Sequence, residues 1–200
     1  MNILVTGHNG LLGPYIVKAI DGTNMYTCSR ASGDYKVDLT NKILVSNVIK
    51  EIEPKVVIHC AAYTNVDKAE KEPEKAFLIN RDATKNIVNS ISLDCHFIYL
   101  STDQVYGNGL DLHQEGDENP INIYGQSKWS GALEARKHLK TTILHTNMFG
   151  PSLVKGRDSF SDIIIKMLEN NIKLTMYSDA YFSPLHFENI AYFINEIIKN

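Results

Sequence analysis

A hydroxyl, a phenol and an ammonium group occur in this chain at spacings suited to carbonyl reduction. Thr102 closely follows an apolar run, and Tyr124 and Lys128 are four residues apart. If Tyr124 lies at a helix start, both side chains project from one face. The ammonium can then lower the phenol pKa from about 10, which prepares Tyr124 to protonate a carbonyl oxygen that Thr102 hydrogen-bonds. We therefore predict a catalytic set for hydride chemistry, although a Tyr–Lys pair at this spacing is also common on ordinary surfaces.

A glycine-rich loop follows the first apolar run of the chain, Ile3–Val5. Gly7 can make a tight turn, Gly10 can let a pyrophosphate approach, and Gly13 can permit close packing of the next helix. A positive φ angle would explain one such glycine, but the place between strand and helix favours dinucleotide binding. We expect Tyr124 and Lys128 to contact the nicotinamide ribose of the bound cofactor as well. The predicted loop contacts are Gly7, Asn9, Gly10, Leu11, Leu12 and Gly13.

The end of the second predicted strand lacks the acidic residue that would bind the ribose 2′-hydroxyl of NAD. Ser29 and Arg30 stand there instead, and Arg30 can pair with a 2′-phosphate. The sequence therefore favours NADPH, with NADH possible, and a solvated loop arginine is the alternative for Arg30. Further along, Asp38 and Leu39 suit the adenine edge, although Asp38 also fits the N-cap region of a helix beginning near Lys42.

The elements that position these residues alternate along the first 145 residues. Short β-branched runs predict strands at 3–6, 25–29, 56–60, 97–100 and 142–144, and helical patterns cover 11–20, 42–52, 73–92 and 125–139. Apolar strands separated by helices predict an α/β fold, a doubly wound parallel sheet of the Rossmann type. After residue 150 we predict helices at 159–170 and 187–199 and a short strand near 173–176. Residues 1–150 are thus the dinucleotide-binding domain, and 151–200 are the remainder of that domain with part of a substrate lobe.

Length and composition suit one domain. Its 200 residues are 44% apolar, enough for a substantial core without disulfides or metal. Lys and Arg number 20 against 23 acidic residues, so the net charge of −3 gives no reason to expect nucleic acid or a membrane as partner. The three cysteines and seven histidines show no ligand spacing, so neither a disulfide nor a metal site is expected. With no basic leader and no apolar stretch of about 18 residues, we predict a cytoplasmic protein.

A longer motif carries a family resemblance. The run from Ala61 to Glu70, with Glu72-Pro73, Asn80 and Ser101–Asp103, resembles the extended short-chain dehydrogenase/reductases, most closely the dTDP-4-dehydrorhamnose reductase family. The resemblance implies that Thr102, Tyr124 and Lys128 are catalytic and that the glycine loop holds NAD(P)H. It also implies cofactor contacts at Ala61, Ala62, Tyr63 and Asn80, and substrate contacts at Thr64, Val66, Asp103 and Gln104.

The reaction implied by the resemblance is reduction of a 4-keto-6-deoxysugar attached to a nucleoside diphosphate, in deoxysugar and polysaccharide biosynthesis. Two places depart from the family pattern: Gln104 stands where an aromatic residue is frequent, and the segment 145–150 lacks a tryptophan. Family members also continue well beyond the helix predicted at 187–199. We therefore expect a reduced substrate lobe, with a pocket that is smaller or completed by a partner.

Two other functions fit parts of the sequence. A non-catalytic dinucleotide-binding subunit, similar to the regulatory subunit of methionine adenosyltransferase, would explain the short C-terminal region but not the intact Thr/Tyr/Lys set. A nucleotide-sugar epimerase or dehydratase would carry an extra acid and a base around Thr102-Asp103 that this chain lacks. Since family members often pair through helices at 73–92 and 125–139, a homodimer is a further expectation.

Overall fold

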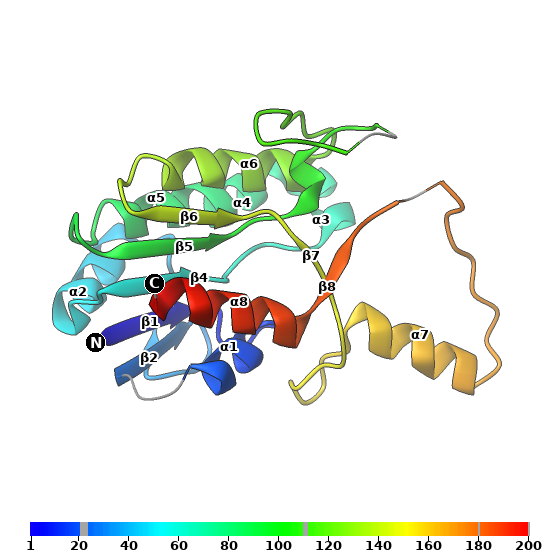
Figure 1. Ribbon diagram of the computed structural model, residues 1–200, viewed down its shortest axis with the longest axis horizontal. Coiled ribbons are helices and arrows are strands. Elements are labelled where there is room, and N and C mark those ends of the chain that lie inside the picture. The colour runs from blue at the N-terminus through cyan, green and yellow to red at the C-terminus, as the bar shows by residue number, and fades with distance from the viewer. Residues whose placement is uncertain (21–23, 110–111, 180, 200) are drawn as a thin grey trace.

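A six-stranded parallel sheet forms the centre of the molecule, with the strand order β3-β2-β1-β4-β5-β6 (Figure 1). The computed structural model describes residues 1–20, 24–109, 112–179 and 181–199. The predicted α/β fold with a doubly wound sheet is confirmed, as are the five predicted strands; the two-residue β3 is an addition. The strands are β1 (Asn2–Thr6), β2 (Asn24–Ser29), β3 (Tyr35–Lys36), β4 (Val56–His59), β5 (His96–Leu100) and β6 (Thr141–Leu144).

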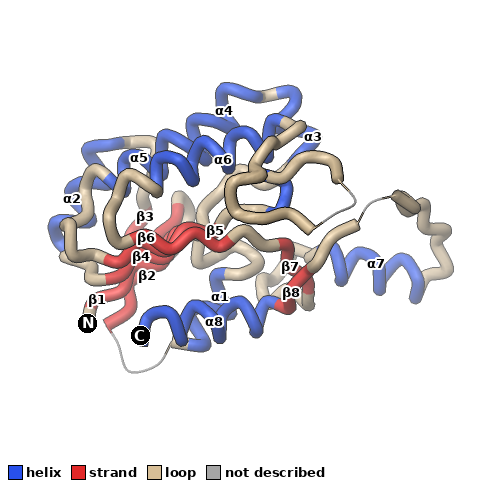
Figure 2. Tube along the Cα trace, turned by 45° about the horizontal axis from the view of Figure 1, so that its top comes forward, coloured by secondary structure: helices blue, strands red, loops and turns tan. Residues whose placement is uncertain are grey.

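Helices cover both faces of the sheet (Figure 2). One face carries α1 and α8, and the other carries α2, α5 and α6. Ile3 and Val5 of β1 point into the first layer, whereas Leu4 points into the second. Burial on both faces explains why the central strands are continuous apolar runs instead of alternating ones.

The helices follow the predicted pattern with changes at their ends. The predicted helix at 73–92 is one run in which α4 and α5 are joined by a π-helical turn, Leu78–Asp82, and a short α3 precedes it. No helix within the described ranges is long and apolar enough to cross a lipid bilayer. The helices of the main body are α1 (Gly13–Ala19), α2 (Lys42–Ile52), α3 (Val66–Lys71), α4 (Pro73–Phe77), α5 (Ala83–Val88), α6 (Ile123–Ala135) and α8 (Phe187–Lys199).

The segment between β6 and α8 forms a two-stranded sheet and a projecting helix. β7 (Asn147–Phe149) pairs in parallel with β8 (Pro184–His186), and α7 (Phe160–Glu169) extends away from the body without a buried residue (Figure 1). The strand predicted near residues 173–176 is wrong: these residues have no regular structure and pair with no strand among the described residues. The helix predicted at 187–199 is confirmed as α8, which packs on α1 in the main core. The division at residue 150 stays a prediction.

Candidate active site

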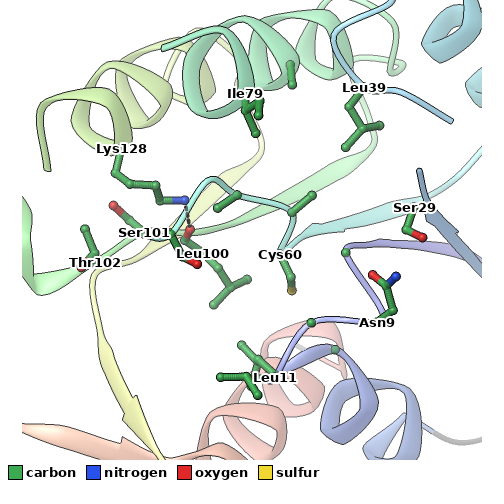
Figure 3. Close-up of a pocket in the computed structure, with 18 of the residues that line it drawn as sticks. Asn9, Leu11, Ser29, Leu39, Cys60, Ile79, Leu100, Ser101, Thr102 and Lys128 are labelled. Atoms are coloured by element: carbon green, nitrogen blue, oxygen red, sulfur yellow. Dashed lines mark hydrogen bonds between the residues drawn. The ribbon is translucent and has the colours of Figure 1, made fainter. Parts of the chain in front are cut away.

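A cavity of about 530 Å³ opens at the carboxyl ends of the central strands (Figure 3). Its walls are the glycine loop after β1 and the loops after β2, β4 and β5, together with the first turns of α6. The chain leaves β1 and β4 toward opposite faces of the sheet, and such a switch point is where doubly wound sheets bind ligands. All the predicted site residues line this cavity except Tyr63, Val66 and Asn80.

These three residues brace the cavity wall from behind. Asn80, only 1% exposed, accepts a hydrogen bond from the Tyr63 backbone N–H at 2.7 Å and donates to the Tyr63 carbonyl at 3.1 Å and to Ser127 Oγ at 2.8 Å. The Tyr63 hydroxyl turns outward and donates to Glu72 at 3.0 Å. Val66 begins α3 and packs in a small cluster beside Tyr124. The three residues shape the loop after β4 and do not line the cavity, and a direct contact of each with a ligand stays a prediction.

The glycine loop allows backbone to approach backbone. Gly7 has a φ angle of +69°, its N–H donates to the Cys28 carbonyl at 2.9 Å, and a Cβ there would lie 2.6 Å from the Ala61 nitrogen. A Cβ on Gly13 would overlap the His8 carbonyl, so this glycine lets α1 pack on its own loop. A Cβ on Gly10 would meet only the Gly7 oxygen, at 3.1 Å. The loop thus leaves its cavity side open to a ligand.

The loop after β2 presents Arg30 to the cavity. Ser29 is buried, and its Oγ donates to the Ser32 carbonyl at 2.9 Å and accepts from the Ser32 N–H at 3.0 Å. Asn9 of the glycine loop donates to Ser32 Oγ at 3.3 Å, which ties the two loops together. The hydroxyl of Ser29 is thus occupied in shaping the turn, and the exposed guanidinium of Arg30 remains available for a ligand.

Asp38 lies in the turn before α2 and is not its N-cap. Its Oδ1 accepts hydrogen bonds from the Thr40 N–H at 3.0 Å and the Thr40 hydroxyl at 2.8 Å, and these bonds lower the pKa of the carboxyl. Asn41 is the N-cap, and its Oδ1 accepts from the Ile43 N–H at 3.1 Å. Asp38 and Leu39 both line the cavity, and their contact with an adenine ring stays a prediction.

The three predicted catalytic residues converge from two elements. Thr102 follows β5, and Tyr124 and Lys128 lie in the first turns of α6, with exposures of 5%, 9% and 2%. Asn122 caps α6 by accepting from the Gly125 N–H at 2.7 Å. A Cβ on Gly125 would overlap the Gln104 carbonyl, so glycine lets the start of α6 lie against the loop after β5. This close approach brings the phenol and the ammonium over the end of β5.

Burial controls the charge of Lys128. Its Nζ donates to the Leu100 carbonyl at 2.6 Å and lies 4.3 Å from the centre of the Tyr99 ring (Figure 3). Removal from water lowers the lysine pKa to about 7, because the charged form loses its hydration. Near neutral pH the side chain therefore holds its charge only in part.

Tyr124 keeps its proton at neutral pH. Burial raises its pKa to about 12, with a smaller increase from the negative charge of Asp103, while the hydrogen bond with Thr102 acts in the opposite direction. Lys128 is not among the causes of this shift, and its Nζ donates to the Leu100 carbonyl. The prediction that the ammonium lowers the phenol pKa is therefore wrong for this arrangement.

His59 is a second buried base behind the site, 1% exposed at the end of β4. Its Nδ1 lies 2.6 Å from Thr6 Oγ1, and its Nε2 has no hydrogen-bond partner among the described residues. Burial, and secondarily the nearby Lys128, lowers its pKa from 6.5 to about 3. The neutral imidazole is thus part of the folded core.

This shift predicts acid sensitivity. Because the folded pKa lies below the unfolded one, the unfolded chain binds the proton first, and stability falls as pH drops from about 6.5 toward 3. We expect the free energy of unfolding of the wild type, measured in urea, to fall by about 2 kcal/mol between pH 7 and 5. The His59→Gln variant should not show this decrease. His113→Gln, at an exposed histidine, should keep the loss. Equal pH slopes for the wild type and His59→Gln would refute this assignment.

Known proteins resemble this chain over most of its length. The family described as the RmlD substrate binding domain matches residues 1–200. The chain belongs to this family. It is 31% identical over 196 residues to a dTDP-4-dehydrorhamnose reductase of Shigella flexneri, covering 96% of this chain and 64% of that relative. It is also 32% identical over 136 residues to methionine adenosyltransferase 2 subunit beta of Bos taurus, covering 64% of this chain and 41% of that one.

The fold also resembles that of a solved reductase structure. A dTDP-4-dehydrorhamnose reductase from Bacillus anthracis, in complex with NADP, superposes with a TM-score of 0.87 at 30% identity. The superposition covers 100% of this chain and 71% of that one. This member of the RmlD substrate-binding-domain family thus spans just under two thirds of the Shigella relative.

Beyond the predicted residues, this RmlD family member brings the segment after β6 into the cavity. Asn147 donates to Asp103 Oδ2 at 2.9 Å, and Thr102 donates to Asp103 Oδ1 at 3.1 Å, so both oxygens of this carboxylate are held. Thr146 and Met148 line the cavity beside Asn147. In the sequence, this segment stood out only because residues 145–150 lack the tryptophan that is frequent in the family. Cys60 and Arg157 also line the cavity, and no pattern in the sequence indicated either.

Proposed function

We propose that this chain supplies the cofactor-binding and catalytic region of an NADPH-dependent reductase acting on a nucleotide-linked 4-keto-6-deoxysugar. The observation that carries the proposal is the convergence of Thr102, Tyr124 and Lys128, each at most 9% exposed, on the cavity formed by the glycine loop. Relatives named dTDP-4-dehydrorhamnose reductase support this substrate class, and the neighbour solved with NADP supports the cofactor.

The cavity fits a phosphorylated dinucleotide in three ways. The open backbone of the Gly10 region suits a pyrophosphate, and the exposed Arg30 suits a 2′-phosphate. Lys128 offers an ammonium at the place where ribose hydroxyls would lie. When bound, NADPH supplies the hydride for the reduction.

Tyr124 is the proposed proton donor. With a pKa of about 12 it carries its proton at neutral pH, which is the state that a donor needs. The O–H bond breaks as the proton passes to the carbonyl oxygen of the sugar, and Thr102 exchanges its hydrogen bond to Asp103 Oδ1 for one to the same oxygen. Lys128, one turn further along α6, is proposed to hold the nicotinamide ribose.

The remaining cavity residues are proposed to hold the sugar nucleotide. Thr64, Asp103 and Gln104 line the cavity on the side of Thr102. Gln104 is held in place by Asn122, which donates to its Oε1 at 2.9 Å. We propose that these polar groups orient the sugar ring, that the reaction takes place in the cytoplasm, and that the α4–α5 and α6 helices form a homodimer contact.

A non-catalytic regulatory subunit is the second candidate. The 32% identity to methionine adenosyltransferase 2 subunit beta favours it. Such a subunit would bind a dinucleotide without turnover. The deciding experiment measures NADPH binding and NADPH oxidation with dTDP-, UDP- and GDP-linked 4-keto-6-deoxysugars. Turnover with one of them supports the reductase, and binding without turnover on all three supports the regulatory subunit.

Arg30 should set the preference for NADPH over NADH. We expect Arg30→Ala to weaken NADPH binding about tenfold, because a guanidinium–phosphate hydrogen bond contributes roughly 1.5–3 kcal/mol. NADH binding should change less than about twofold. Fluorescence titration with both nucleotides measures the difference, and Lys36→Ala, an exposed cation outside the cavity, is the control. Equal weakening of both nucleotides would assign Arg30 another role.

A further inference from the structure

The loop between β7 and α7 is held against α1. The Tyr15 hydroxyl donates to the Pro151 carbonyl at 2.7 Å, and the Ser159 hydroxyl donates to the Gly150 carbonyl at 2.6 Å. Asp162 of α7 accepts from the Ser152 N–H at 2.9 Å. The loop is therefore fixed on the same side of the sheet as the helix that follows the glycine loop (Figure 1).

This loop brings Arg157 to the cavity. Arg157 is exposed and lines the cavity together with Leu11 of the glycine loop and Met148 of β7. Among the described residues, two other cationic side chains line the cavity, and both differ from Arg157 in position or in partner. Arg30 follows β2, and Lys128 donates to the Leu100 carbonyl. Arg157 therefore adds positive charge on the side of α1.

The guanidinium of Arg157 has no partner within the described part of the chain. The adjacent Asp158 accepts from Lys166 at 2.6 Å. Asp162 accepts from the backbone N–H groups of Ser152 and Ser159, at 2.9 and 2.8 Å. The nearby carboxylates are thus engaged, which leaves the five N–H donors of Arg157 for an external acceptor.

We propose that Arg157 is an anion-binding residue of this cavity that contacts the diphosphate of a bound ligand. A planar guanidinium matches phosphate oxygens two at a time, and the open glycine-loop backbone beside it favours the same chemistry. The inference rests on the proposed function, because that function supplies two ligands that carry a diphosphate. One is the diphosphate of the dinucleotide, and the other is that of the nucleotide sugar.

Binding measurements on three variants test the inference. Calorimetric titrations with NADPH, dTDP and inorganic diphosphate are made on the wild type, Arg157→Ala and Arg157→Lys. Lys155→Ala is the matched control, since Lys155 is an exposed cation in the same loop that does not line the cavity. We expect Arg157→Ala to weaken inorganic diphosphate and one of the two nucleotides about tenfold. Arg157→Lys should recover part of this affinity, and Lys155→Ala should match the wild type.

The pattern of loss identifies the source of the diphosphate. Weakening of NADPH alone assigns Arg157 to the cofactor, and weakening of dTDP alone assigns it to the sugar nucleotide. If the wild type binds neither nucleotide, the proposed function fails, while a loss of inorganic diphosphate binding in Arg157→Ala still supports the anion site. Affinities for all three probes equal to those of Lys155→Ala, or no diphosphate binding by the wild type, overturn the inference.

Discussion

Replacing Tyr124 with phenylalanine should lower turnover by about 10²–10⁴-fold, the usual contribution of a positioned general acid. The substitution removes a buried phenol hydroxyl that carries its proton at neutral pH. The ring itself stays, so its packing in the small cluster with Ala69 and Ala76 is retained. We therefore expect the affinity for NADPH to change less than about twofold. Initial rates of NADPH oxidation and a fluorescence titration measure the two quantities.

Tyr192→Phe is the control for this experiment. Tyr192 is 58% exposed on α8 and lies outside the cavity, so its hydroxyl should not affect the rate. A Tyr124→Phe variant that keeps more than about a tenth of the wild-type rate would remove Tyr124 from the proposed mechanism. Loss of NADPH binding in the same variant would point instead to a role for the phenol in holding the cofactor.

Replacing Lys128 with methionine should abolish most turnover and at the same time stabilise the protein. Methionine has similar length and needs no hydration, whereas the buried ammonium is costly enough to bring the lysine pKa from 10.5 to about 7. The folded pKa lies below the unfolded value, so the unfolded chain binds the extra proton at neutral pH. Stability of the wild type should therefore rise with pH between about 7 and 10.5.

We expect the wild type to gain about 2 kcal/mol of unfolding free energy between pH 7 and 9, and Lys128→Met to gain almost none of it. At pH 7 the variant should unfold at the higher urea concentration, although loss of the hydrogen bond to Leu100 reduces the difference. Affinity for NADPH should fall about tenfold or more, since an ammonium beside the ribose is lost. A Lys128→Met variant that is less stable at pH 7 and keeps the wild-type pH slope would show that Lys128 is charged and well solvated in the folded chain.

The close packing of α6 sets the charge states of both Tyr124 and Lys128. Gly125 and Gly131 let this helix lie against the loop after β5 and against Tyr99, where a Cβ would overlap Gln104 and Asn80 carbonyls. Close packing excludes water from the site, which raises the pKa of Tyr124 and lowers that of Lys128. The same packing thus gives a protonated phenol at neutral pH and a lysine whose pKa lies near 7.

Much of the fold and the site is encoded locally and could be predicted from the sequence alone. Strand positions follow from short apolar runs, and the need for glycine at positions 7 and 13 follows from the strand–turn–helix order in which they occur. The four-residue spacing of Tyr124 and Lys128 places both on one face of α6 wherever that helix packs. These features depend on neighbours within a few residues along the chain, so they can be predicted from the sequence.

Only the tertiary structure decided which side chains face the cavity and in which charge state. Tyr63 and Asn80 lie in a motif that resembles cofactor contacts, yet neither lines the cavity, and the Asn80 side chain is hydrogen-bonded to the Tyr63 backbone. Burial inside the fold lowers the pKa of Lys128 to about 7. Arg157 reaches the cavity on a loop that is tied to Tyr15, far away in the chain. Burial and long-range contacts set these outcomes, since desolvation depends on every element packed around a group and on no short stretch of sequence.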